Sequence, residues 1–141
     1  MKYYTMTYLE SGVNSEFLMF GVSKESHTEE LYLGSQEFDW SMNLKDGRIH
    51  NNEPNQEGTS YGLRSLKDTI IECIVDWLWG TVTFIQNGRN MGVAFTDENI
   101  ASGPLYFAIS MDCNDVSRIE ILETESNNID LKSDIAAVVK K

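Results

Sequence analysis

Residues 76–110 read DWLWGTVTFIQNGRNMGVAFTDENIASGPLYFAIS, and this stretch decides the fold class. At its centre the pair Asn87-Gly88 separates two runs rich in β-branched and aromatic residues, 81–86 and 89–95. An Asn-Gly pair adopts the positive φ angles of a two-residue hairpin turn, whose twist matches that of the strands it joins. The stretch therefore predicts a β-hairpin. Its expected inward positions are Val82, Phe84, Val93 and Phe95, with Thr81 and Thr83 facing outward and Ile85 breaking strict alternation.

The rest of the chain repeats this pattern of short apolar runs separated by turn residues. The polar segments 23–36 and 51–60 are expected to be surface loops, and Asp46-Gly47 is expected to form a second hairpin turn. Because the strands follow one another at intervals of about 8 to 12 residues without helices between them, the pattern predicts an antiparallel β-sandwich or barrel. The further strands are expected at 2–10, 17–22, 38–44, 48–50, 69–76, 105–110 and 117–123.

The chain is expected to divide into a β-sandwich over residues 1–123 and a tail over residues 124–141. In the tail, three polar residues are suitable caps for a helix: Ser126, Asn127 and Asn128. Four apolar residues then fall on one helical face: Leu131, Ile135, Val138 and Val139. We therefore expect a short C-terminal helix that packs against the sandwich or against a neighbouring chain.

Size and charge exclude several classes of protein. A chain of 141 residues suits one domain with one core. With 11 basic and 22 acidic residues it carries a net charge of −11, which repels nucleic acid and anionic membrane surfaces. No signal peptide is recognisable, and no apolar run reaches the ~20 residues of a membrane span. The two cysteines, Cys73 and Cys113, indicate reduced thiols rather than a disulfide framework. We expect an intracellular, cytoplasmic protein.

The sequence offers little for catalysis. Its two histidines, His27 and His50, have no partner residues in a catalytic motif. Asn87-Gly88 lies in a hairpin, whereas a phosphate-binding loop would precede a helix. Three residues near one strand end offer oxygen ligands for a hard cation, although turn chemistry explains them without a metal: Asp112, Asn114 and Asp115. The sequence therefore predicts no enzyme activity, no cofactor and no metal.

Segment 76–110 also strongly resembles the signature of the SPRY family. That signature has an Asp at a strand end, a Gly-Thr strand running into Asn-Gly, a Gly-Val-Ala-Phe strand, and then Leu-Tyr-x-x-x-Ser. Further similarities at Glu10-Ser11-Gly12, Phe20-Gly21-Val22-Ser23 and Thr59-Ser60-Tyr61-Gly62 extend the resemblance over about 2–123. The resemblance implies a bent sandwich of two antiparallel sheets, the concanavalin-like jelly roll, and a non-catalytic protein-interaction module.

Leu33-Gly34-Ser35 and Trp40-Ser41-Met42-Asn43 are similar to a stretch of the SPRY adaptors that carry a SOCS box or F-box and recruit targets to ubiquitin ligases. Neither box is present in the sequence, so a ubiquitin-ligase or larger multidomain context is an expectation only. Cys113-Asn114 stands where the adaptors commonly have an aromatic followed by Gly, so their ligand preference is not carried over. Transferred by position, the adaptors' contact loops imply partner-binding residues at Glu29, Tyr32, Ser35, Asp112, Cys113 and Asn114.

The aromatic residues outside the hairpin have competing interpretations. Tyr32 lies between two leucines in a polar loop, so it is either an exposed anchor for a partner or a ring that packs the loop onto the core. Trp40 is expected in the core. Trp77 and Trp79 are separated by one residue, are expected to share a face near the Asp76 turn, and offer a second contact site if exposed.

The leading hypothesis is a module whose edge loops bind a peptide or loop of a partner protein through hydrogen bonds and one aromatic anchor. A carbohydrate-binding sandwich is an alternative, because sandwich folds host many functions. The other alternative is a structural domain of a larger assembly. SPRY family members usually have one or more strands before the strand that begins here near Tyr3, so the tail or a second chain is expected to complete a sheet edge.

Overall fold

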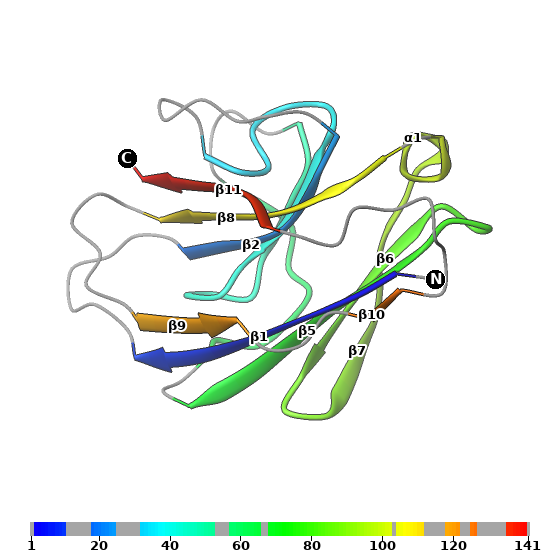
Figure 1. Ribbon diagram of the computed structural model, residues 1–141. Helices are drawn as coiled ribbons and strands as arrows, with labels where there is room; N and C mark the ends of the chain where they lie inside the picture. The colour runs from blue at the N-terminus through cyan, green and yellow to red at the C-terminus, as the bar shows by residue number, and fades with distance from the viewer. Residues whose placement is uncertain are drawn as a thin grey trace.

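The computed structural model describes residues 2–10, 18–24, 32–52, 57–65, 68–102, 104–111, 118–121, 125–126 and 135–140. These residues form two β-sheets that stack as two layers, together with one short helix (Figure 1). The expected β-sandwich is confirmed.

The first layer, called sheet A here, contains six strands among the described residues. They are β1 (Lys2–Glu10), β5 (Thr69–Asp76), β6 (Thr81–Gln86), β7 (Arg89–Thr96), β9 (Arg118–Ile121) and β10 (Glu125–Ser126). Their order is β10-β1-β5-β6-β7, and β9 also pairs with β1. All these pairs are antiparallel, and the β5-β6 and β6-β7 pairs are hairpins of consecutive strands.

The second layer, called sheet B here, contains five described strands. They are β2 (Leu18–Ser23), β3 (Asp39–Asn43), β4 (Ile49–His50), β8 (Tyr106–Met111) and β11 (Ile135–Lys140). Their order is β11-β8-β2-β3-β4. The β11-β8 pair is parallel, whereas the other pairs are antiparallel. The helix α1 (Glu98–Ala101) lies between β7 and β8 in the chain.

The expected C-terminal helix is wrong where the structure describes the tail. Residues 135–140 form strand β11, in which Val138 pairs with Ile109 of β8. Residues 127–134, which include Leu131, lie outside the described residues. The β-branched residues Ile135, Val138 and Val139 suit a strand, and the edge of β8 offers main-chain groups for pairing, whereas a short isolated helix is only marginally stable in water. Long-range pairing therefore overrides the helical periodicity of the tail.

The β6-β7 hairpin has the predicted turn, but its second strand differs from the expectation. Asn87 and Gly88 both have positive φ, 49° and 80°, as the two-residue turn requires. Val93 was expected inside, yet it is 57% exposed. The register of β7 shifts twice against β6, so that Val93 lies opposite Thr83, an outward position. These β-bulges insert extra residues into an edge strand, and a local alternation pattern does not reveal them.

The core lies between the two sheets and is centred on aromatic rings. Phe20 of β2 packs edge-on against Phe107 of β8 and against Phe84 of β6, with ring centroids 4.9 and 6.0 Å apart. The second contact joins the two layers. Trp40 is fully buried in the same cluster, as expected. Each large apolar side chain buried in this way contributes roughly 1.5 to 3 kcal/mol to folding.

Candidate functional site

The candidate site is built on the loop between β2 and β3, of which residues 32–38 are described. At the start of this stretch 32–38, Tyr32 and Leu33 form a small buried cluster with Met19 of β2 and Ala108 of β8. Met19 alternates along β2 with residues of the main core, so this cluster lies on the opposite, outer face of sheet B. The loop therefore folds back over the outside of the sandwich.

Hydrogen bonds fix this loop to the sheet. The Ser41 hydroxyl donates to the carbonyl oxygen of Leu33 at 2.7 Å, and the Ser35 hydroxyl donates to that of Tyr32 at 2.8 Å. The buried carboxylate of Asp39 accepts the Ser23 hydroxyl at 2.7 Å, so the base of the loop is held between β2 and β3. Such a loop loses little further conformational freedom when a partner binds.

Close backbone approach explains the glycine in this loop. Gly34 has φ of 108°, and a Cβ placed there would lie 2.6 Å from both the Ser41 hydroxyl oxygen and the His50 Cβ. The Tyr32 ring packs edge-on against the His50 ring, with centroids 5.9 Å apart. His50 of β4 is itself buried beneath this loop.

The β2-β8 register shows how this loop runs along the sheet. Met19, which shares the small cluster with Tyr32, pairs with Ser110, the residue before Met111. Met111 ends β8, and the segment 112–117 that follows it lies outside the described residues. From Tyr32 the loop returns to the opposite end of sheet B, where the Phe38 carbonyl oxygen accepts the Lys24 N–H and Ser23 pairs with both Asp39 and Tyr106.

The structure describes two of the six predicted contact residues. Tyr32 is only 2% exposed, so the expectation of an exposed anchor is wrong at this position, and the ring packs the loop onto the sheet. Ser35 is half-buried, and the next two residues, Gln36 and Glu37, are exposed. The remaining predicted contacts lie outside the described residues: Glu29, Asp112, Cys113 and Asn114.

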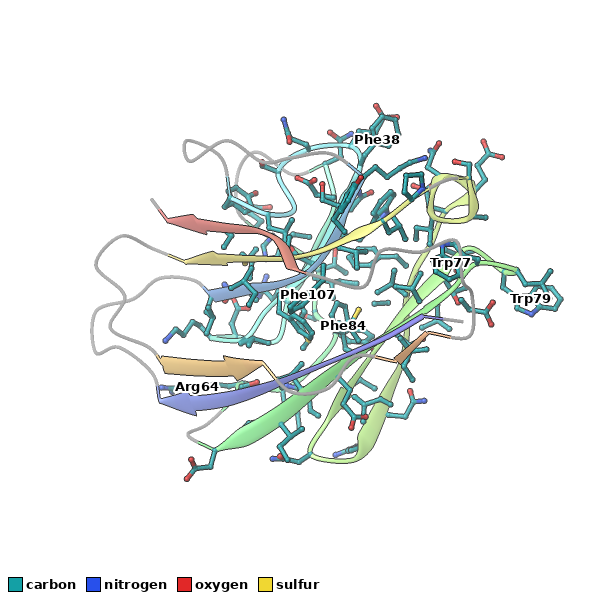
Figure 2. The ribbon with its side chains drawn as sticks, in the orientation of Figure 1. Phe38, Arg64, Trp77, Trp79, Phe84 and Phe107 are labelled. Atoms are coloured by element: carbon teal, nitrogen blue, oxygen red, sulfur yellow. The ribbon has the colours of Figure 1, made fainter. Side chains whose placement is uncertain are left out.

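The tryptophans near Asp76 do not share a face, because residues 77–80 form the turn between β5 and β6. Trp77 is half-buried and packs against the core, whereas Trp79 is 72% exposed. Figure 2 shows Trp79 projecting beyond the ribbon at the tip of this hairpin. The sequence did carry a signal for this turn, because only residues 77–80 separate the expected strands 69–76 and 81–86, which the structure pairs as Asp76 with Thr81.

Two groups with shifted pKa values lie in or against the core. Burial raises the pKa of the Cys73 thiol well above its ordinary value. Burial also raises the pKa of Tyr61, whose hydroxyl accepts the Phe84 N–H at 3.1 Å and donates to the Gly92 carbonyl oxygen. Among the described residues, no three His, Cys, Asp or Glu side chains gather as metal ligands. No helix in the described part of the chain is long and apolar enough to cross a membrane.

Comparisons with known proteins identify the fold. No curated protein matches the chain in sequence. A human SPRY domain matches in structure with a TM-score of 0.58 and 17% identity, over 66% of this chain and 59% of that one. The SPRY domain of human HERC1 matches with a TM-score of 0.54 and 20% identity, over 68% of this chain and 58% of that one. The chain thus aligns with less than two thirds of each, and at these identities the likeness shows the fold alone.

The sequence itself carries the family assignment. The family model described as the SPRY domain matches residues 2–123, which is most of the chain. The bent pair of sheets, the Asn87-Gly88 hairpin and this match agree. The chain therefore belongs to the SPRY domain family, whose members are in general protein-interaction modules without catalytic activity.

Proposed function

We propose that this chain binds an extended peptide or loop of a partner protein across the outer side of sheet B, from the exposed rim of the 32–38 loop toward the Met111 end of β8. One observation carries the proposal. Tyr32 lies in one buried cluster with Met19 and Ala108 on the outer face of sheet B, and Met19 pairs with Ser110, one residue before Met111. The loop is thereby fixed on the outer face of a sheet whose strand β8 leads to Met111, and rigid scaffolds present binding loops in this way.

The loop supports such binding in two layers. Tyr32 lies underneath the loop, and the half-buried Ser35 bonds to its carbonyl oxygen. Gln36 and Glu37 are exposed and present polar side chains toward solvent. The hydrogen bonds of Ser35 and Ser41 preform the loop, so that little ordering remains to oppose binding. Contacts at Glu29, Asp112, Cys113 and Asn114 stay predictions.

The proposal is for a module without catalysis. The two groups with shifted pKa values, Cys73 and Tyr61, owe those shifts to burial, and Tyr61 is hydrogen-bonded to the backbone. Similarity to adaptors with a SOCS box or F-box, a ubiquitin-ligase context and a cytoplasmic location also stay predictions. Because β10 pairs with β1 and β11 pairs with β8, we propose that the 124–141 tail folds together with the 1–123 sandwich.

Site-specific crosslinking tests this binding face. A photo-crosslinking amino acid replaces Gln36 in one variant and Asn114 in another, and each protein is irradiated in a lysate of its native cells. Gln36 is exposed and uses its backbone carbonyl in the fold, which the replacement retains. A variant with the crosslinker at Thr83, on the outer face of sheet A, is the matched control.

The expected result is that positions 36 and 114 capture the same partner protein and that position 83 does not. Capture of that partner with equal yield at position 83 would contradict the proposed face. Capture at neither loop position, while the unmodified protein still binds a partner, would move the site elsewhere.

A further inference from the structure

The turn between β5 and β6 is held by groups other than its large side chains. The Asp76 carboxylate accepts the Leu78 N–H at 3.0 Å. Gly80 has φ of 64°, and a Cβ there would lie 2.6 Å from the Asp97 carbonyl oxygen, so glycine is required. The Asp97 N–H in turn donates to the Gly80 carbonyl oxygen at 2.8 Å. These three residues therefore fix the turn against the start of α1.

Two large apolar side chains of this turn are left in water. Leu78 is 84% exposed and Trp79 is 72% exposed. Of the aromatic side chains whose burial the structure describes, Trp79 alone is exposed. Neither side chain is needed for the geometry of the turn, and an exposed Trp beside an exposed Leu is typical of a binding anchor. Figure 2 shows the indole free of the surrounding side chains at the hairpin tip.

The charges around this tip are acidic. Asp76 precedes the turn, Asp97 bonds to its last residue, and Glu98 is the exposed first residue of α1. Against these three carboxylates, the structure places Lys2 of β1 opposite Val75, one residue before Asp76, and Lys24 at the other end of α1, where it donates to the Ser102 hydroxyl. The face of an indole ring attracts cations, and Trp binds them better than Tyr or Phe. The tip therefore combines apolar anchors with a surface that favours positive charge.

We propose that the tip formed by Leu78, Trp79 and the acidic residues Asp76, Asp97 and Glu98 docks a basic segment of a partner protein, with Arg or Lys beside an aliphatic residue. The cation stacks on the Trp79 ring, the aliphatic residue packs on Leu78, and the three carboxylates attract the segment and set its orientation. This surface goes beyond the proposed function, because it lies on the β5-β6 turn and shares no residue with the 32–38 loop.

Charge decides between this occupant and the other candidates. A second copy of the chain carries the same net charge of −11, and contact between two such tips would bring carboxylates together. The same field repels an anionic membrane surface. A sugar would stack on Trp79 but would gain nothing from Leu78 or from the net charge of the tip. A basic, partly apolar segment uses every feature of this surface.

Peptide selection tests the proposal. A phage-displayed random peptide library is selected on the wild-type protein and, separately, on a double variant with Leu78→Ala and Trp79→Ala. Peptides recovered only by the wild type are synthesised, and their affinities are measured by fluorescence anisotropy. Leu63→Ala is the matched control, because Leu63 is also exposed, at 54%, but lies outside the tip. All variants should keep the wild-type melting temperature, since the altered side chains are exposed.

The expected peptides carry Arg or Lys beside an aliphatic residue. Trp79→Ala should weaken them by about tenfold or more, whereas Leu63→Ala should leave them unchanged. Glu98→Gln should also weaken them, and so should raising the salt from about 0.1 to about 1 M, which shortens the Debye length from about 10 to about 3 Å.

Several results would overturn the proposal. The absence of any tip-dependent peptide would do so, as would tip-dependent peptides that are neutral or acidic. Binding to neutral phosphatidylcholine vesicles that Trp79→Ala abolishes would assign the tip to a membrane. Trp79-dependent binding on a glycan array would assign it to carbohydrate, and a concentration-dependent dimer lost in Trp79→Ala would assign it to a second copy. None of these measurements depends on positions 36 or 114, so this surface and the proposed function fail separately.

Discussion

Substituting Tyr32 with alanine separates support of the loop from direct contact with a partner. The ring is 2% exposed and packs with Met19, Leu33 and Ala108 on the outer face of sheet B, and edge-on against His50. An exposed anchor would lose affinity and keep stability. A supporting ring should lose stability first, because its removal leaves a cavity between the loop and the sheet.

The magnitude follows from the packing. Truncating a large buried aromatic to alanine costs about 3 to 5 kcal/mol in a main core. The Tyr32 cluster is small and covered by a loop that can partly collapse, so we expect about 3 kcal/mol. The shift in melting temperature per kcal/mol falls as a domain grows, and for a chain of 141 residues a loss of about 3 kcal/mol corresponds to a fall of roughly 10 °C.

The assay is thermal and urea denaturation of three variants beside the wild type. Tyr32→Phe retains the ring and should lose less than about 1.5 kcal/mol, the scale of one hydrogen bond. Gln36→Ala alters an exposed side chain of the same loop and should stay within about 0.5 kcal/mol. If Tyr32→Ala melts within about 2 °C of the wild type while losing its partner, the ring is an anchor and the packing argument is refuted.

Three further substitutions test other features of the structure. Burial raises the pKa of the Cys73 thiol, so its contribution to the unfolding free energy is complete below the unfolded pKa of about 8.5 and is lost above it at about 1.4 kcal/mol per pH unit. Between about pH 8 and pH 10 the unfolding free energy of the wild type should therefore fall about 2 kcal/mol more than that of Cys73→Ala in urea denaturation. Equal losses in the two proteins would exclude a buried thiol. Gly21→Ala should abolish cooperative unfolding, because its Cβ would lie 2.0 Å from the Trp40 carbonyl oxygen, and a variant with a wild-type melting curve would contradict this close approach. Tyr61→Phe removes the acceptor of the Phe84 N–H and should cost about 1 to 3 kcal/mol of unfolding free energy, whereas an unchanged urea midpoint would show that water replaces it.

Features set by neighbouring residues could be predicted from the sequence. The turn at Asn87-Gly88 depends on two residues whose backbone preferences are strong, so its position and the pairing of Gln86 with Arg89 followed directly. Once that hairpin and the turn signals around it were placed, the succession of strands excluded parallel α/β architecture. The family resemblance then accounted for the layering of the two sheets.

Features that depend on distant partners could not be predicted. The tail has a helical period, yet residues 135–140 pair with β8, and the period carries no information about an available sheet edge. Val93 alternates correctly for an inward position, but bulges in the edge strand turn it outward. Tyr32 had equal claims to exposure and burial because the buried cluster that holds it includes Met19, which lies on β2, 13 residues earlier in the chain.

The β5-β6 turn shows why a candidate surface can be found only after the fold is known. Asp76 and Gly80 carry the local chemistry of the turn, so the sequence leaves the three residues between them unconstrained. In a strand, Trp77 and Trp79 would lie on the same face. In the turn that the structure shows, Trp77 packs against the core and Trp79 is exposed to solvent. The sequence does not show which of the two indole rings is exposed, so an unfavourable exposed indole can be recognised only in the structure. Of the aromatic rings whose burial the structure describes, all except Trp79 are buried or half-buried, and we therefore infer that its exposure reflects the proposed binding role rather than the demands of folding.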